Sequence, residues 1–199
     1  MKVIELQLEL KKRLLRACHQ HIEFLKSDLS GKTLSSYTFL CCDGFRNIGI
    51  ASCTTEKIEE LKSKNNTPAY FRELDISEWD YFNTYYETFS SVDEFIDELY
   101  LVLYDGYLED VNLDGFSTDE LWGFISNFFE LTFLEVFEKL EKLNFFNTFV
   151  FNNDVFKGIQ LSDPDIHMKA AIERISVVLN NHSWHMKLLA NGFVAQTYL

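Results

Sequence analysis

Residues 34–53 read LSSYTFLCCDGFRNIGIASC, two runs of strand-forming residues on either side of an Asp-Gly pair. Aromatic, branched and small apolar residues dominate the runs Leu34–Cys42 and Asn47–Cys53, and this composition favours extended backbone. Asp43-Gly44 is a turn pair, because both residues tolerate the backbone angles that a reversal of the chain needs. The segment therefore predicts a β-hairpin with a short connecting loop.

Amphipathic helices are expected before and after this hairpin. From Val3 to about Ser27, apolar residues recur at three- and four-residue steps, which places them on one side of a long helix. The residues expected to face inward are Ile4, Leu8, Leu15, Cys18, Ile22 and Leu25. A second helix is expected from the cap residue Thr54 to about Lys64, since its glutamates lie near the start and its lysines near the end.

Two capping boxes predict helices in the middle of the chain. Ser91 precedes Glu94, and Ser117 precedes Glu120, at the spacing that lets a serine and a glutamate cap each other's backbone groups. The first of these helices has a continuous apolar face, formed by Val92, Phe95, Ile96, Leu99 and Leu103. The second extends to about Leu143, and its wide arc of phenylalanines predicts a central, buried helix.

Shorter strands and one further helix complete the expected elements. We expect strands at Tyr70–Leu74, Phe149–Phe151 and Val155–Leu161, with an Asn-Asn-Asp turn between the last two. The helix starts where Asp163 caps it and Pro164 takes its first position. Its inward side consists of Met168, Ala171, Ile172, Ile175 and Val178.

This order of elements indicates the fold class. Strands interrupted by helices, with hairpin-like pairs toward both ends of the chain, predict an α+β fold. We expect residues 1–199 to form a single α+β domain with a mostly antiparallel sheet and several packed helices. The alternative is an α/β sheet with some parallel pairing.

Size and cysteine content indicate a chain that folds without a cross-link. A chain of 199 residues buries roughly 70% of its unfolded surface, so it needs neither a disulfide nor a metal. The four cysteines form no CxxC pair and are typical of reduced thiols. Charges such as Lys2 and Glu5 interrupt any apolar core of a signal peptide, and no apolar run reaches the ~20 residues of a membrane span. We therefore expect a cytoplasmic protein with no cofactor and no membrane contact.

The distribution of charge is the most informative feature of the sequence. Between Glu73 and Glu138 there is no lysine, arginine or histidine, although 18 acidic residues lie in that segment. The rest of the chain holds all 18 basic residues against 31 − 18 = 13 acidic ones. A surface of one sign favours partners of the opposite sign and disfavours nucleic acid, whose phosphates are negative. Solubility alone is the competing explanation.

The helix expected after Ser91 carries most of the candidate binding residues. Tyrosine beside carboxylate is a mixture typical of protein interfaces, because tyrosine gives contact area at low entropic cost. The predicted partner-binding set is Asp93, Glu94, Asp97, Glu98, Tyr100, Tyr104, Glu109 and Asp110. We expect these residues to present an acidic face to a basic protein, although a partly buried core edge would explain the tyrosines equally well.

A second hypothesis is an enzyme or a metal-binding protein. Asp163, Asp165 and His167 lie together at an expected helix start, and His182 and His185 offer two more imidazoles. Helix capping is the structural explanation for these carboxylates. The sequence contains no GxSxG, GxGxxG, Walker or HExxH motif.

Two further patterns are typical of metal sites but incomplete. Cys18 and His21 share a helix face, which supplies only two of the three or four ligands that zinc needs. Asp110, with the alternating polar residues after it, resembles the front of a calcium loop, but position twelve of that loop is Leu121, which cannot bind a metal. Trp79 is either a binding anchor or a buried residue that holds an irregular segment in place.

Four short motifs carry a resemblance to a known family. They are Ser36-Tyr37-Thr38-Phe39, Thr54-Thr55-Glu56, Ser77-Glu78-Trp79-Asp80-Tyr81 and Ser162-Asp163-Pro164-Asp165. Together they resemble the bacterial family catalogued as domain of unknown function 4303, over about Leu8 to Val178. The resemblance brings no catalytic residues with it. It implies an immunity or inhibitor role near bacterial toxin systems, where an acidic protein would suit a basic nuclease toxin.

The chain offers a third hypothesis in its own basic residues. Lys11, Lys12, Arg13 and Arg16 lie largely off the apolar side of the first helix. They could pair with the acidic segment of a second copy, which would make the chain a homodimer. The leading hypothesis remains a non-enzymatic module that binds a basic protein.

Overall fold

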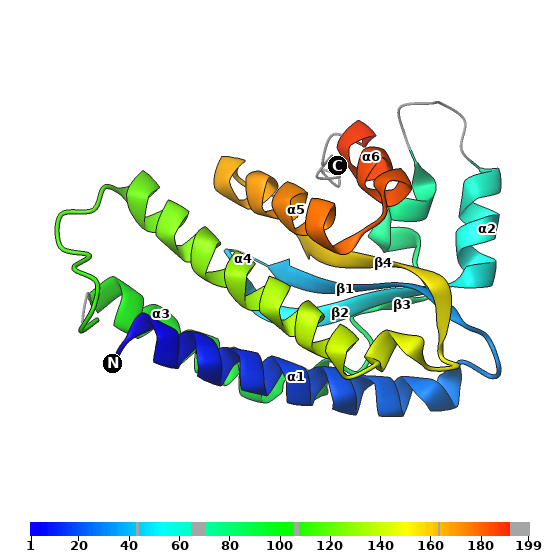
Figure 1. Ribbon diagram of the computed structural model, residues 1–199, viewed down its shortest axis with the longest axis horizontal. Helices are drawn as coiled ribbons and strands as arrows, with labels where there is room; N and C mark the ends of the chain where they lie inside the picture. Colours follow the sequence, from blue (N-terminus) through cyan, green and yellow to red (C-terminus); the bar gives the residue numbers. More distant parts are fainter. Residues whose placement is uncertain (43, 65–70, 106–107, 163, 192–199) are drawn as a thin grey trace.

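A computed structural model describes residues 1–42, 44–64, 71–105, 108–162 and 164–191 (Figure 1). Its helices are α1 (Val3–Asp28), α2 (Thr55–Ser63), α3 (Ser90–Asp105), α4 (Thr118–Lys142), α5 (Ile166–Leu179) and α6 (His182–Ala190). Its strands are β1 (Leu34–Cys42), β2 (Arg46–Thr54), β3 (Tyr81–Phe82) and β4 (Phe151–Leu161). Short 3₁₀ helices are η1 (Arg72–Leu74), η2 (Ile76–Glu78), η3 (Tyr86–Phe89) and η4 (Phe145–Asn147).

The strands form one mixed sheet in the order β3-β2-β1-β4. The predicted hairpin is present, with Phe39 of β1 opposite Ile50 of β2 in an antiparallel pair. β3 continues the antiparallel part, whereas β4 lies parallel to β1, with Phe39 beside Ile159. The predicted α+β class with a mostly antiparallel sheet is confirmed, and the parallel pairing of the alternative occurs at one edge.

Helices cover the face of the sheet that carries Phe39. In Figure 1, α4 crosses in front of the strands, α1 lies below it, and α5 and α6 lie along the β4 side. Phe39 stacks on Phe133 of α4 with ring centroids 4.9 Å apart, and Phe45 stacks on Phe129 at the same distance. The prediction of a central, buried α4 is therefore confirmed by its contacts.

On the opposite face of the sheet, two tryptophans pack against Phe156. Phe156 of β4 alternates with its neighbours and points away from α4. Its ring lies 6.5 Å from Trp79 and 5.5 Å from Trp184 of α6, measured between centroids. Trp79 is buried, and its indole nitrogen donates a hydrogen bond of 3.0 Å to the carbonyl oxygen of Glu73. Trp79 therefore holds the irregular segment in place and is not a surface anchor.

At Lys157, the free edge of β4 is closed by one side chain. The Asn180 amide oxygen accepts a hydrogen bond of 2.8 Å from the backbone nitrogen of Lys157, and its amide nitrogen donates one of 2.6 Å to the Lys157 carbonyl. These backbone groups would otherwise offer a site for pairing with another chain. Because Asn180 also caps α5, it joins that helix to the edge of the sheet.

Several predicted boundaries were wrong. The Asn-Asn-Asp sequence does not end the last strand, because β4 runs from Phe151 to Leu161, but the pairing with β1 shifts register there: Leu34 pairs with Phe151 and Ser36 with Phe156. The expected strand before Asp75 is the 3₁₀ helix η1 in its described part. Ser91 caps no helix, since α3 follows directly from η3 and begins at Ser90. α5 is capped by Asp165, which accepts from the Met168 nitrogen at 2.8 Å, and Asp163 lies outside the described residues.

The apolar side of α1 was only partly predicted. Cys18, Ile22 and Leu25 are buried as expected, and Leu15 is partly buried, but Ile4 and Leu8 are exposed. The residues that face the core in their place are Leu6, Leu10 and Leu14. Val178 of α5, expected inside, is also exposed. α1 therefore carries a second apolar stripe that the core does not cover.

Candidate functional site

The outward side of α3 carries three exposed carboxylates and two exposed apolar residues. We define the α3 outer face as Glu94, Asp97, Glu98, Leu101 and Tyr104, which share one side of the helix by their three- and four-residue spacing. Leu101 is 65% exposed and Tyr104 is 52% exposed. The three acids are exposed, and within the described residues none of them lies in an ion pair. The face is therefore acidic with an apolar strip at its C-terminal end.

The inward side of α3 holds that face in position. All five residues predicted to form the apolar face of this helix are buried. Asp93, predicted to bind a partner, is half-buried; its carboxylate accepts from the Ile48 nitrogen at 2.8 Å and from the Tyr86 hydroxyl. Burial raises the pKa of Asp93 above its ordinary value, although the two hydrogen bonds oppose that shift. Asp93 therefore ties α3 to β2 and is not part of the exposed face.

Tyr100 is a second predicted binding residue that points inward. It is buried, and its hydroxyl donates to the carbonyl oxygen of Gly44 in the hairpin turn. The Arg46 guanidinium lies 4.4 Å from the centroid of its ring, and Tyr104 stacks on it at 5.7 Å. Burial raises the pKa of the Tyr100 phenol well above its ordinary value, so the hydroxyl stays a neutral donor. The buried ring of Tyr100 therefore packs against the exposed ring of Tyr104 and holds it in position.

The last two predicted binding residues hold the N-terminal end of α1. The Glu109 carboxylate lies 2.7 Å from the amine of Met1, and Asp110 accepts from the Val3 nitrogen at 3.0 Å. Both side chains are exposed, but each has a structural partner. The predicted set therefore falls into three groups: four residues of the exposed α3 face, two that fasten α3 to the hairpin (Asp93 and Tyr100), and two that fasten the start of α1 (Glu109 and Asp110).

The acidic segment does not form one continuous negative surface. Seven of its carboxylates lie beside basic groups from outside the segment, so the chain neutralises much of the segment itself. These pairs are Glu73–Lys187, Glu78–Arg72, Glu109–amine of Met1, Asp119–His167, Glu130–Arg174, Glu135–Lys11 and Glu138–Lys142. Among the described residues, three of the exposed acids without an ion pair, Glu94, Asp97 and Glu98, lie together on the α3 outer face.

The residues of the alternative hypothesis have structural roles. Asp165 caps α5, and His167 Nε2 lies 2.8 Å from the Asp119 carboxylate at the start of α4. His185 Nδ1 lies 3.3 Å from the Ser176 hydroxyl, and His182 is exposed. Within the described parts of the chain, no group of three or more metal-binding side chains comes together. The structure thus brings His167 to Asp119 but not to His182 or His185.

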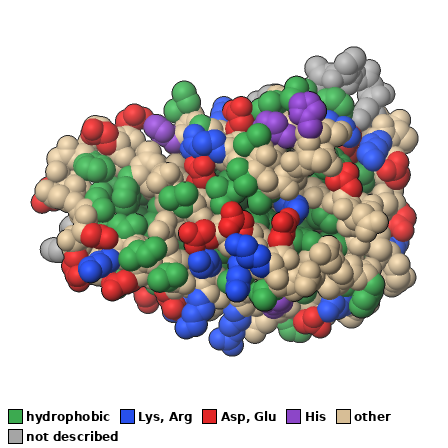
Figure 2. All heavy atoms as spheres, in the orientation of Figure 1, with side chains coloured by type: hydrophobic (Ala, Val, Ile, Leu, Met, Phe, Trp, Pro, Cys, Tyr) green, Lys and Arg blue, Asp and Glu red, His purple; other side chains and the backbone are tan. Residues whose placement is uncertain are grey.

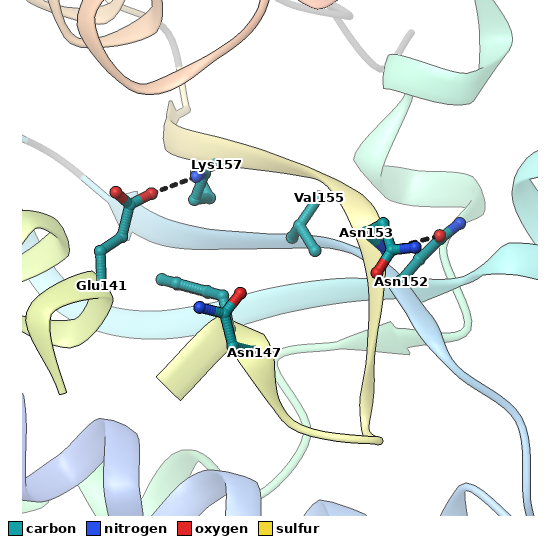
Figure 3. A pocket seen from close by; sticks show the side chains of 7 residues that line it. Glu141, Asn147, Asn152, Asn153, Val155 and Lys157 are labelled. Atoms are coloured by element: carbon teal, nitrogen blue, oxygen red, sulfur yellow. Dashed lines mark hydrogen bonds and ion pairs between the residues drawn. The ribbon is translucent and has the colours of Figure 1, made fainter. Parts of the chain in front are cut away.

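A small polar hollow lies where the C-terminal end of α4 meets η4 and β4 (Figure 3). Its volume is about 230 Å³. Lys157 points to Glu141 across the opening and forms an ion pair with it, and Asn152 donates to the Ser35 hydroxyl. Ligand pockets are usually about 300–1,000 Å³ and lined by apolar groups. This smaller hollow is explained by the junction of three elements.

The sequence had indicated Tyr104 but not its apolar neighbour Leu101. Leu101 follows Asp97 by four residues and Glu98 by three, so its position on the acidic side could have been read from helical spacing. Arg46 was also missed, because its contact with Tyr100 joins residues far apart in the chain. Such a contact leaves no local pattern.

Comparisons with known proteins identify no matching family model, no similar curated protein and no similar solved structure. The resemblance to the domain of unknown function family therefore stays a prediction. Among the described residues, no helix combines the length and apolarity needed to cross a membrane.

Proposed function

We propose that this chain is a non-enzymatic protein-binding module that presents the α3 outer face to a basic protein. The observation that carries the proposal is the clustering of three exposed carboxylates with two exposed apolar side chains on one side of α3. Glu94, Asp97 and Glu98 remain exposed and without an ion pair among the described residues, whereas seven other acids have basic neighbours. Like charges at this spacing cost a few tenths of a kcal/mol, which a partner's lysines or arginines would recover.

The composition of the face supports a protein partner over a nucleic acid. Exposed carboxylates repel phosphate, while Leu101 and Tyr104 add the apolar and aromatic contact that protein interfaces contain. The charges would speed the encounter, and the apolar strip would slow dissociation. The family resemblance implies an immunity protein that binds a basic toxin. The four free cysteines fit our proposal of a cytoplasmic location.

Charge reversal on α3 tests the proposal. The tagged chain is used to capture proteins from its own source at low and high salt, and captured proteins are identified by mass spectrometry. We expect a basic protein that is released at high salt and lost in the variant Asp97→Lys/Glu98→Lys. Both substituted positions are exposed, so the fold should tolerate them.

A matched control separates this face from overall charge. Glu59 and Glu60 are adjacent exposed glutamates on α2, and Glu59→Lys/Glu60→Lys changes the net charge by the same amount. That variant should still capture the partner. Equal capture by both variants would contradict the proposal. Mass measurements against salt would show whether the captured species is instead a second copy.

A further inference from the structure

The second apolar stripe of α1 lies on the side of that helix that faces α4. Lys11 of α1 contacts Glu135 of α4 at 2.6 Å, which marks the two facing sides. Ile4 and Leu8 precede Lys11 by seven and three residues and therefore share its side. They are 51% and 52% exposed. This stripe continues from a point where the two helices are in contact.

The facing side of α4 is also apolar. Leu131 and Phe124 precede Glu135 by four and eleven residues, so both share the side that faces α1. Leu131 is 44% exposed, and Phe124 is partly buried against the core. Figure 1 shows α1 and α4 spreading apart toward their N-terminal ends, beyond the Lys11–Glu135 contact. We define the α1–α4 patch as Ile4, Leu8, Phe124 and Leu131.

The α1–α4 patch is an exposed surface of the kind that binds another protein. Figure 2 shows hydrophobic side chains gathered over the left half of the molecule, where α1 and α4 diverge. Two diverging helices with apolar facing sides form a surface on which a third helix can pack, because the side chains of that helix repeat at the same three- and four-residue steps. Contiguous apolar surface of this kind usually marks an interaction site.

The charges around the open end of the patch indicate which kind of helix would bind there. Exposed carboxylates lie at the N-terminal ends of both helices and in the loop that precedes α4, namely Glu5, Glu109, Asp110, Asp114, Asp119 and Glu120. Among the described residues, the basic groups at that end are Lys2, the amine of Met1, which pairs with Glu109, and His167, which lies beside Asp119. The rim is therefore negative, which favours a helix with lysines or arginines beside its apolar side.

The same charges disfavour a second copy of this chain. Two copies joined through their patches would bring two negative rims together, at a cost in repulsion. The basic run of α1 offers little compensation, because Lys11 pairs with Glu135, and Lys12 and Arg13 pair with Glu9. We propose that the α1–α4 patch docks a basic amphipathic helix of a partner protein. This inference rests on the proposed function in one respect, the basic charge of the partner. The surface that would bind the partner's helix is a separate one.

A defined peptide tests the inference. The probe is a synthetic helical peptide of about 18 residues, with leucines on one side and lysines on the other. We expect it to bind the full chain in fluorescence anisotropy, and the variant Leu8→Ser/Leu131→Ser to bind at least about tenfold more weakly. A peptide with glutamates in place of the lysines should not bind.

Matched variants decide between outcomes. Val177 and Val178 of α5 are similarly exposed, so Val177→Ser/Val178→Ser removes as much apolar surface and should leave binding unchanged. Asp97→Lys/Glu98→Lys should weaken peptide binding by less than about threefold, since it acts through long-range charge alone. The inference is overturned if the peptide does not bind the unaltered chain, or if it binds the Leu8→Ser/Leu131→Ser variant equally well. It is also overturned if the unaltered chain is a dimer in solution and this variant is a monomer. If the Asp97→Lys/Glu98→Lys variant still captures the natural partner, that result counts against the proposed function but not against this inference.

Discussion

The phenol oxygen of Tyr37 on β1 lies 3.3 Å from Nδ1 of His21 on α1, and both side chains are buried. On the other side of the imidazole, Nε2 lies 3.2 Å from the carbonyl oxygen of Thr84. Because a carbonyl only accepts, Nε2 carries the ring hydrogen and Nδ1 accepts from Tyr37. A neutral His21 therefore joins α1, the sheet and the segment before η3.

This contact predicts loss of stability in mild acid. Burial lowers the pKa of His21 to about 4, against an ordinary value of 6.5. Between these values the unfolded chain binds a proton that the folded chain does not, so stability falls as pH drops. Tyr37 and Cys18 beside it stay neutral, because burial raises the pKa of each. From about pH 7 to about pH 5 the His21 contribution should fall by about 2 kcal/mol.

The measurement is urea unfolding of the unaltered chain and His21→Gln at both pH values. Carboxylates titrate alike in the two proteins, so their difference isolates His21. The free energy of unfolding should fall less in the variant. Equal losses in the two proteins would show that His21 is not held neutral.

The α3 outer face predicts a variant that gains stability while it loses binding. Glu94 and Glu98 are four residues apart and repel each other. Glu98→Lys replaces this repulsion by a favourable pair and should raise the free energy of unfolding by about 0.5 kcal/mol at low salt. The gain should shrink in high salt. Thermal unfolding measures the gain, and partner capture measures the loss; a variant that loses stability would contradict the repulsion.

The local part of the fold could be predicted, because its causes are local. Ser117 and Glu120 cap α4 as their spacing indicates, and β1 matches its predicted bounds. Each of these depends on residues within a few positions of one another. The α3 side chains divide into inward and outward sets by the same short spacing, so the exposure of Glu94, Asp97 and Glu98 follows from it, while their binding role stays a prediction.

The rest depends on partners that sequence spacing does not reveal. Asp93 fits a helix start by composition, but its bond to Ile48 spans 45 residues. Asn152 fits a turn by composition, but it lies within β4, where its amide donates to the hydroxyl of Ser35, 117 residues away, and the pairing with β1 resumes at Phe156. Leu8 fits the apolar side of α1 as well as Leu10 does, and the direction in which α4 packs decides which one is exposed.

The closed edge of β4 predicts a role for Asn180 in stability and in solubility. Asn180→Ala leaves the nitrogen and the carbonyl of Lys157 without their hydrogen bonds. We expect a loss of about 1–2 kcal/mol in urea unfolding, and more aggregation at high concentration, since the strand edge becomes free to pair. Asn153→Ala, at an exposed position on the same strand, is the control and should change stability by less than about 0.5 kcal/mol. Equal effects would show that the edge contact does not matter.

Glu130 on α4 and Arg174 on α5 form an ion pair, and we predict that replacing one residue or the other changes the free energy of unfolding by different amounts. The guanidinium donates to both carboxylate oxygens, with Nε–Oε1 at 2.8 Å and Nη2–Oε2 at 2.6 Å. Glu130 is buried and Arg174 is largely exposed, so Arg174→Met leaves a buried charge and should cost about 2–3 kcal/mol. Glu130→Gln leaves no buried charge and should cost less, and the double variant should cost less than the sum of both. Urea unfolding of the three variants, with Lys62→Met of an exposed pair as control, measures the coupling; additive losses would mean that the two residues act independently.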